Sequence, residues 1–368
     1  MNSELNLLFL RYPIVIIIFI TGYIAPFLTK KNILFGSRIP DEYTDSHKIE
    51  QLKRDYKHLY MVIMAPVLVI LMFLLYSISD NSVILTGIFL QVFLNFYIQV
   101  LFNHKVKKVK KTLVKNDAAN KEQAVIIDTN FRGGNYLVPL KWFVPSVIII
   151  LLNVVYTAQN FNKIPAMIPE RFDMSGKVFQ YIYKSNINVY NTSFISIFNL
   201  LLFLGVYFGI KRARQDLNSS FPQQAILQDR QSRYLWSVYF VTLSFLLTFY
   251  FTIISLHVNR LFILPDELFT FINIAFPNLV LMSAVFLAVK TGQSGSRLKI
   301  ETKEAELKTN FKDDDDNWKL GMFYYNPDDP AIMIPKRMGV GWTLNFGHPI
   351  SFILIGAVIF IPQIMKKF

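Results

Sequence analysis

Residues 59–102, "LYMVIMAPVLVILMFLLYSISDNSVILTGIFLQVFLNFYIQVLF", decide the fold class. They contain two apolar runs, Leu59–Ser79 and Val83–Phe102. Each run has about the length, roughly 20 residues, that a membrane-spanning helix needs. Only "DNS", Asp80 to Ser82, separates them, so the two helices must turn back on each other as a hairpin. This stretch predicts an integral membrane protein built from antiparallel helices.

The rest of the chain has the same character. It is 53% hydrophobic and only 17% charged, whereas soluble domains are roughly 25% charged. Six further apolar runs are Leu10–Leu28, Val138–Ala158, Val189–Ile210, Leu235–Leu256, Leu268–Val289 and the short Ile350–Met365. We therefore expect an all-α polytopic membrane bundle of about eight transmembrane helices, with a small β-rich cytoplasmic segment before the last helix.

The basic residues give an orientation. The segments 29–58, 103–137, 211–234 and 290–349 carry 29 of the 38 Lys and Arg residues, and the loops that alternate with them carry few. The positive-inside rule places these four segments in the cytoplasm and both termini outside, in a multi-pass protein of the cell membrane. If the last run lies only at the interface, the C-terminus stays inside. The net charge of +13 then faces anionic membrane lipids, and we expect no direct contact with nucleic acid.

Several kinds of chemistry lack support. The chain has no cysteine, and none of its five histidines is spaced to pair with a nucleophile. Zinc-protease and phosphate-loop motifs are absent too. The run Asp313–Asp316, followed by Asp328 and Asp329, suggests a cation site, but its spacing is not that of a calcium loop. A run of four aspartates is usually solvated. We expect no catalytic residues, no cofactor and no metal site.

The loop "IPAMIPERFDMSGKV", residues 164–178, lies between the fourth and fifth spans on the predicted outer face. Pro165 and Pro169 favour extended backbone before them, and Gly176 suits a turn. Such a stiff loop would hold its charged side chains in place for a ligand. The alternative is a cap whose prolines only end the preceding helix.

This loop resembles the signature P-x-x-I-P-x-H-F-x-x-x-G of the SdpI-like family, with Arg171 in place of the histidine. The resemblance implies a bacterial multi-pass membrane protein with an immunity or signalling role toward a secreted killing factor. A role that needs an imidazole is not implied, because arginine neither titrates near neutral pH nor binds metals. The implied ligand contacts are Pro165, Pro169, Glu170, Arg171, Phe172, Asp173 and Gly176.

A second stretch, Asn32–Tyr56, resembles the N-x-x-x-G-x-R-x-P segment of the same family through Asn32, Gly36, Arg38 and Pro40. After it, Thr44 or Asp45 is a candidate cap for a short amphipathic helix from Lys48 to Leu59. We expect this helix to lie along the cytoplasmic interface.

A third stretch, Asp313–Pro349, resembles a small domain of unknown function found near the end of such membrane proteins. Its runs "MFYYN" and "AIMIPKR" are β-prone and are separated by the turn "NPDDP", so we expect a hairpin or clasp. The resemblance singles out Trp318, Tyr324, Asn326, Asp329, Lys336, Arg337, Trp342 and Asn345 as site residues of this cytoplasmic domain.

In the third span, Gln91, Asn95 and Gln99 recur every four residues and so share one helix face. Lipid exposure of three amides is costly, so this face points into the bundle. It either forms interhelical hydrogen bonds or lines a polar path.

We expect five regions: 1–137, 138–210, 211–290, 291–349 and 350–368. The favoured function is an immunity or signal-transducing receptor whose partners are an extracellular peptide or antimicrobial factor and a cytoplasmic regulatory protein. The alternative is a transporter or lipid-handling protein that uses the polar face of the third span.

Overall fold

The computed structural model describes residues 2–77, 81–114, 136–172, 176–217, 221–302 and 313–365. Helices dominate these residues, and every apolar run expected from the sequence overlaps one of them. The helices are α1 (Asn2–Ile24), α2 (His47–Ser77), α3 (Asn81–Val114), α4 (Val144–Gln159), α5 (Asn186–Arg212), α6 (Pro222–Val258), α7 (Asp266–Thr291) and α8 (Pro349–Met365).

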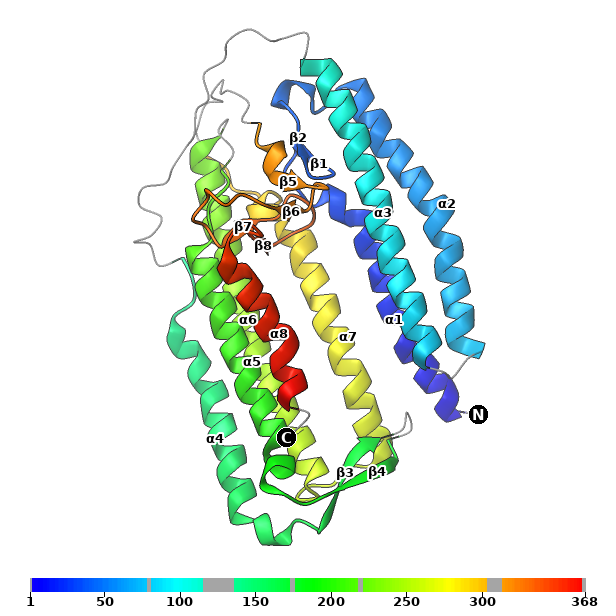
Figure 1. Cartoon of the computed structure of the whole chain (residues 1–368), viewed down its shortest axis with the longest axis vertical. Helices are drawn as coiled ribbons and strands as arrows, with labels where there is room; N and C mark the ends of the chain where they lie inside the picture. Colours follow the sequence, from blue (N-terminus) through cyan, green and yellow to red (C-terminus); the bar gives the residue numbers. More distant parts are fainter. Residues whose placement is uncertain are drawn as a thin grey trace.

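Short strands form four two-stranded antiparallel sheets in the described part of the chain. They pair in chain order: β1 (Ile33–Leu34) with β2 (Ser37–Arg38), β3 (Met167–Phe172) with β4 (Val178–Tyr183), β5 (Trp318–Lys319) with β6 (Phe323–Tyr324), and β7 (Met333–Pro335) with β8 (Trp342–Leu344). The β3–β4 hairpin lies at one end of the helices and the other three sheets lie at the opposite end (Figure 1). We call these the hairpin end and the module end, and residues 313–348 the C-terminal module.

Six helices, α2 to α7, are long and apolar enough to cross a membrane. Two shorter apolar helices, Tyr12–Phe27 and Pro349–Phe360, fall within α1 and α8 and their immediate flanks. These lengths and compositions fit the predicted class of a helical membrane protein.

Helices α1, α2 and α3 pack around an aromatic core. Tyr56 and Tyr60 of α2 and Phe102 of α3 are fully buried there. Phe35, which follows β1, stacks between Tyr56 and Phe102 with ring centroids 4.7 and 5.2 Å away. Buried aromatic pairs of this kind add to the burial of their apolar area, so the β1–β2 turn is fixed to the end of this helix trio.

The segment Lys48–Leu59 differs from its expected place at the interface. It is helical, but it is the first third of α2 and continues without a break into the apolar part of that helix. Ile49, Leu52 and Tyr56 are buried against the β1–β2 region and α3. These core contacts hold the segment along the axis of α2, because the apolar area they bury outweighs interfacial binding by a weakly amphipathic helix.

Helices α4, α5 and α6 form a second group, in which the Tyr207 hydroxyl donates to the Val138 carbonyl at 2.7 Å. Helix α7 lies between the two groups (Figure 1). None of the 18 residues in the most apolar stretch of α7 is buried inside the molecule, whereas 22% to 33% are buried in the corresponding stretches of the other five helices. Helix α7 is therefore less buried than the other five, although Tyr239 and Tyr250 of α6 contact its middle.

The strands of the C-terminal module pair differently from the expectation. The run "MFYYN" does not pair across "NPDDP" with "AIMIPKR"; β6 pairs back with β5, and β7 pairs forward with β8. A single parallel bridge, Tyr324 to Asn345, joins the two sheets. The glycines at 321, 339 and 341 have positive φ, so the tight turns they allow favour local hairpins over the longer connection.

Candidate functional site

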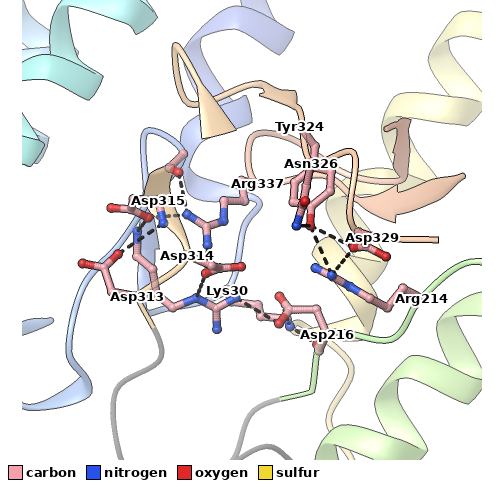
Figure 2. Close-up of polar contacts among 12 residues, drawn as sticks. Lys30, Arg214, Asp216, Asp313, Asp314, Asp315, Tyr324, Asn326, Asp329 and Arg337 are labelled. Carbon is pink, nitrogen blue, oxygen red and sulfur yellow. Dashed lines mark hydrogen bonds and ion pairs between the residues drawn. The ribbon is translucent and has the colours of Figure 1, made fainter. Parts of the chain in front are cut away.

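A network of ion pairs at the module end joins segments that are far apart in the sequence. Lys30 and Arg38 of the β1–β2 region both bind Asp216, which follows α5; the Nζ–Oδ2 and Nη2–Oδ1 distances are both 2.9 Å. Arg38 also lies 3.4 Å from Asp314 of the C-terminal module. Figure 2 shows these groups converging from three parts of the chain.

The aspartate run forms the other half of this network. Lys110 of α3 lies 2.7 Å from both Asp313 and Asp315. Arg337, whose side chain is only 2% exposed, pairs with Asp314 and Asp315. The expectation of a solvated run is therefore wrong for Asp314 and Asp315, which neutralise the buried Arg337, whereas Asp313 pairs with Lys110 but stays half-exposed. We call Lys30, Arg38, Lys110, Asp216, Asp313, Asp314, Asp315 and Arg337 the charged hub.

The hub sets the ionisation of its carboxylates. Burial alone raises the pKa of Asp216, but Arg38 and Lys30 outweigh it and hold this pKa well below the ordinary value of 3.8. The same balance, with Arg337 and Lys110 as the cations, lowers the pKa of Asp315. Both carboxylates are thus ionised at neutral pH, and the four cations meet four carboxylates.

Two glycine turns touch beside the hub. Gly36 (φ +79°) lies in the β1–β2 turn and Gly321 (φ +75°) in the β5–β6 turn. A Cβ on Gly36 would come 2.0 Å from the Gly321 carbonyl oxygen. Asn103 of α3 donates to the Phe35 carbonyl at 2.6 Å and to Ser37 Oγ at 3.1 Å. The N-terminal hairpin and the C-terminal module therefore meet backbone to backbone.

Several residues singled out in the module fix its internal structure. Asp329 accepts hydrogen bonds from the Tyr324 hydroxyl (2.8 Å) and from Arg214 (2.5 Å), which follows α5. The buried amide of Asn345 donates to the carbonyls of Asn326 and Asp329 at 2.8 and 3.0 Å. The Asn345 bonds tie the "NPDDP" turn to the end of β8. The bond of Asp329 to Arg214 ties the turn to the α5–α6 connection (Figure 2).

The remaining candidates of the C-terminal module differ in burial. Trp318 is buried against Tyr324 and under the Arg337 guanidinium, which lies 5.1 Å from its ring centroid. Trp342 lies 5.7 Å from the fully buried Arg233 of α6. Lys336 is exposed. Most of these residues therefore hold the module on the helices, and Lys336 faces solvent.

At the hairpin end, the two prolines and Gly176 act as expected from the sequence. Pro165 is exposed just before β3, and Pro169 is buried within β3 and pairs with Tyr181. Gly176 has φ +84°, and a Cβ there would lie 2.4 Å from the Asp266 carbonyl oxygen. The hairpin is therefore fixed against the start of α7. Asp173 lies outside the described residues.

The charged candidates of this loop face solvent, whereas its aromatic candidate faces the helices. Glu170 and Arg171 are exposed, and Glu170 accepts a hydrogen bond from Gln180 at 2.6 Å. Phe172 is partly buried and makes tilted ring contacts with Phe269 of α7 and His257 of α6, with centroids 4.6 and 5.6 Å away. Arg171 is thus available to a ligand, whereas Phe172 connects the hairpin to two helices.

The outer face of the hairpin is aromatic. Ile168 and Ile182 pack inward, while Phe179, Tyr181 and Tyr183 of β4 are 61%, 50% and 75% exposed. Single exposed apolar side chains are ordinary, but three alternating aromatics on one strand form a contiguous surface.

The polar face of α3 is buried and hydrogen-bonded. Gln91 donates to the Val15 carbonyl of α1 at 2.9 Å. Asn95 accepts from the Tyr60 hydroxyl of α2 at 2.6 Å, and Gln99 is hydrogen-bonded to Tyr56. These contacts support interhelical bonding as the role of the face.

Helix α7 joins the two ends. Phe269 in its first turn stacks on Phe172, and Gln293, just after its last turn, makes two hydrogen bonds of 2.9 and 2.8 Å with the backbone of Gly341. The Gln293 N–H also donates to the Leu28 carbonyl at 2.8 Å. One helix therefore contacts the hairpin, the module and the end of α1.

The sequence analysis did not identify Lys30, Lys110, Asp216 or Gln293. One signal was available: Asp216 and Asp229 are the two acids in the basic segment 211–234. An acid among cations often pairs with one of them. The partners of Asp216 nevertheless lie about 180 residues away, and only the fold brings them together.

Comparison with known proteins gives one match. Residues 327–351, which include β7, β8 and the start of α8, are similar to a family of unknown function, DUF5808. No curated protein and no solved structure matches the chain.

Proposed function

We propose that this protein is a membrane receptor of the immunity or signal-transducing kind, with eight membrane crossings. The β3–β4 hairpin binds an extracellular peptide. Helix α7 then transmits the resulting shift of the hairpin to the C-terminal module on the cytoplasmic side. The SdpI-like resemblance of the hairpin and the positive-inside distribution of Lys and Arg support this assignment.

The observation that carries the proposal is the placement of α7. Its first turn touches the hairpin through Phe269, and the residues after its last turn hold the module through Gln293. The helix has 26 residues, about 39 Å at 1.5 Å per residue. Its middle contains no fully buried residue and contacts α6 through Tyr239 and Tyr250, so a shift at the hairpin can be carried along the helix axis to Gln293.

The hairpin also suits an extended peptide. Strand β3 is a poor edge for pairing, because Pro169 lacks an N–H and the register is irregular around Glu170. Strand β4, "VFQYIY", has no proline and no charge, and it pairs only with β3 in the described sheets. Such an edge can accept a further strand, with Phe179, Tyr181 and Tyr183 contacting alternate side chains of the peptide.

The coupling is tested by hydrogen exchange of residues 313–348 in the full-length protein. Phe172→Ala removes the ring that joins the hairpin to α6 and α7, and we expect faster exchange in the C-terminal module at the far end. The matched control is Phe271→Ala, which removes an equal ring from an exposed position of α7. Equal exchange of the module in both variants contradicts transmission through α7.

Ligand binding and sidedness need separate experiments. Cells that express the protein are exposed to secreted antimicrobial peptides, and we expect the triple variant Phe179→Ala, Tyr181→Ala, Tyr183→Ala to lose protection while it still inserts. The chain has no cysteine, so Arg171→Cys and Lys336→Cys can each be labelled with a membrane-impermeant maleimide. Labelling of both from the same side of the membrane rules out the proposed route.

The transporter alternative stays a prediction. Its main feature, the polar face of α3, is occupied by hydrogen bonds to α1 and α2, and no observation at that face favours a solute path.

A further inference from the structure

Helices α2 and α3 are longer than a membrane requires. They contain 31 and 34 residues, or about 46 and 51 Å, whereas the hydrocarbon core is about 30 Å thick. Their surplus lies at the module end, where α2 begins and α3 ends, and there they reach farther than the neighbouring sheets (Figure 1). We call residues 47–58 and 103–114 the stalk.

The stalk carries an excess of positive charge. Its two halves contain nine Lys and Arg residues against two carboxylates, Glu50 and Asp55. More than half of the net charge of +13 therefore belongs to 24 residues. The cations are Lys48, Lys53, Arg54, Lys57, Lys105, Lys107, Lys108, Lys110 and Lys111.

Most of these cations face solvent. Lys110 points inward to the hub, and Lys53 pairs with Glu50. Lys48, Lys108 and Lys111 are exposed, and no carboxylate of the described residues forms an ion pair with them. Concentrated unpaired charge of one sign attracts a partner of the opposite sign.

The direction of the stalk decides which anions it can reach. Its helices are continuous with the apolar parts of α2 and α3, and Leu52, Tyr56, Phe102 and Val106 pack between them. The stalk therefore projects along the helix axes and does not lie on the bilayer. Lys111 and Lys48 stand about 13 to 17 Å beyond the expected span ends. The headgroup layer takes up roughly 5 to 7 Å of this distance, so these two cations lie about one Debye length of about 8 Å beyond the headgroups.

We infer that the stalk is a docking surface for an acidic segment of a soluble protein. The distance argues against lipid headgroups as the partner of the outermost cations. Eight of the nine cations are lysines, and the rings of Tyr56 and Phe102 are buried. The stalk thus offers one arginine fork, Arg54, and no exposed tyrosine, phenylalanine or tryptophan ring, whereas nucleic-acid recognition relies on such forks and rings. This inference stands on the stalk alone and does not depend on the receptor role.

The test measures binding of a fluorescent 20-residue polyglutamate peptide to the full-length protein in nanodiscs of neutral lipid. The triple variant Lys48→Gln, Lys108→Gln, Lys111→Gln is compared with the matched triple Lys299→Gln, Lys319→Gln, Lys336→Gln, which removes equal charge at exposed positions outside the stalk. We expect about tenfold weaker binding for the stalk triple and less than twofold for the matched triple. We also expect Phe172→Ala, the variant that tests the receptor proposal, to bind the probe with the affinity of the wild type. Failure of the receptor proposal therefore leaves the result for the stalk unchanged.

Three results overturn the inference. One is equal loss of affinity in the two triple variants, which means that only net charge matters. Another is loss of probe binding when the discs contain anionic lipid, because headgroups then occupy the stalk. The last is tighter binding of a 20-nucleotide single strand than of the glutamate peptide, which assigns the surface to nucleic acid.

Discussion

Replacing Gly36 by alanine tests the contact between the first hairpin and the C-terminal module. Positive φ at this position costs an alanine about 1 kcal/mol. The new Cβ would lie 2.0 Å from the Gly321 carbonyl oxygen, whereas an ordinary carbon–oxygen contact is about 3.3 Å. The turns must separate by about 1.3 Å, and this overpacking costs about 2 kcal/mol more. Loss of the Asn103 bond to the Phe35 carbonyl adds about 1 kcal/mol.

The matched variant is Gly339→Ala. Gly339 has a similar φ of +74°, but a Cβ there meets no atom within 4 Å. It therefore keeps the backbone cost of about 1 kcal/mol and lacks the clash. The difference of about 3 kcal/mol corresponds to about 150-fold in the opening equilibrium of the module.

The assay is hydrogen exchange of amides in residues 313–325, followed by mass spectrometry of the full-length protein in nanodiscs. We expect exchange to accelerate far more in Gly36→Ala than in Gly339→Ala. If the two variants differ by less than about threefold, the turns do not support each other and the packing described for Gly36 and Gly321 is incorrect.

Three further outcomes are expected. The folded-state pKa values of Asp216 and Asp315 lie below 3.8, so their ion pairs stabilise the module fully above that pH and lose this contribution as pH falls through the folded values. The rate of proteolysis of the module, measured between pH 6 and 3, should therefore rise at the acidic end. Asp216→Asn should make this rate depend less on pH. Asn345→Ala leaves two carbonyls without their donor, so we expect a loss of about 2 kcal/mol in unfolding free energy of the module, measured by denaturant-dependent tryptophan fluorescence. Tyr60→Phe removes the donor to Asn95 and should lower the melting temperature in detergent by a few degrees at a cost of about 1 kcal/mol, with no change if the amide is not bonded.

The helical part of the fold could be predicted because each apolar run is long enough to require a helix in lipid. The two prolines and the one glycine of residues 164–178 likewise predicted the local backbone, since Pro169 fixes φ and Gly176 tolerates the positive φ of a turn. The start of α2 was misplaced for a physical reason. Its surface is charged, and only tertiary contacts of Ile49, Leu52 and Tyr56 reveal that it is packed and upright.

The hub could not be predicted from local pattern. Lys30 and Asp216 are 186 residues apart, and Lys110 and Asp315 are 205 apart. A run of aspartates looks solvated when no cation is near in the sequence. The aspartate run is partly buried because residues 313–315 pack beside the β1–β2 turn, although seven helices come before them in the chain. Amino-acid composition does not predict such a long-range contact.

The meeting of Gly36 with Gly321 has a consequence for biogenesis. The ribosome completes the first hairpin almost 300 residues before its docking partner is made, so Lys110 waits without Asp313 and Asp315, whereas Lys30 and Arg38 can already pair with Asp216. A polypeptide truncated before residue 313 therefore leaves Lys110 without its two carboxylates and Arg38 without Asp314. Synthesis of residues 313–337 thus supplies the last charges of the hub.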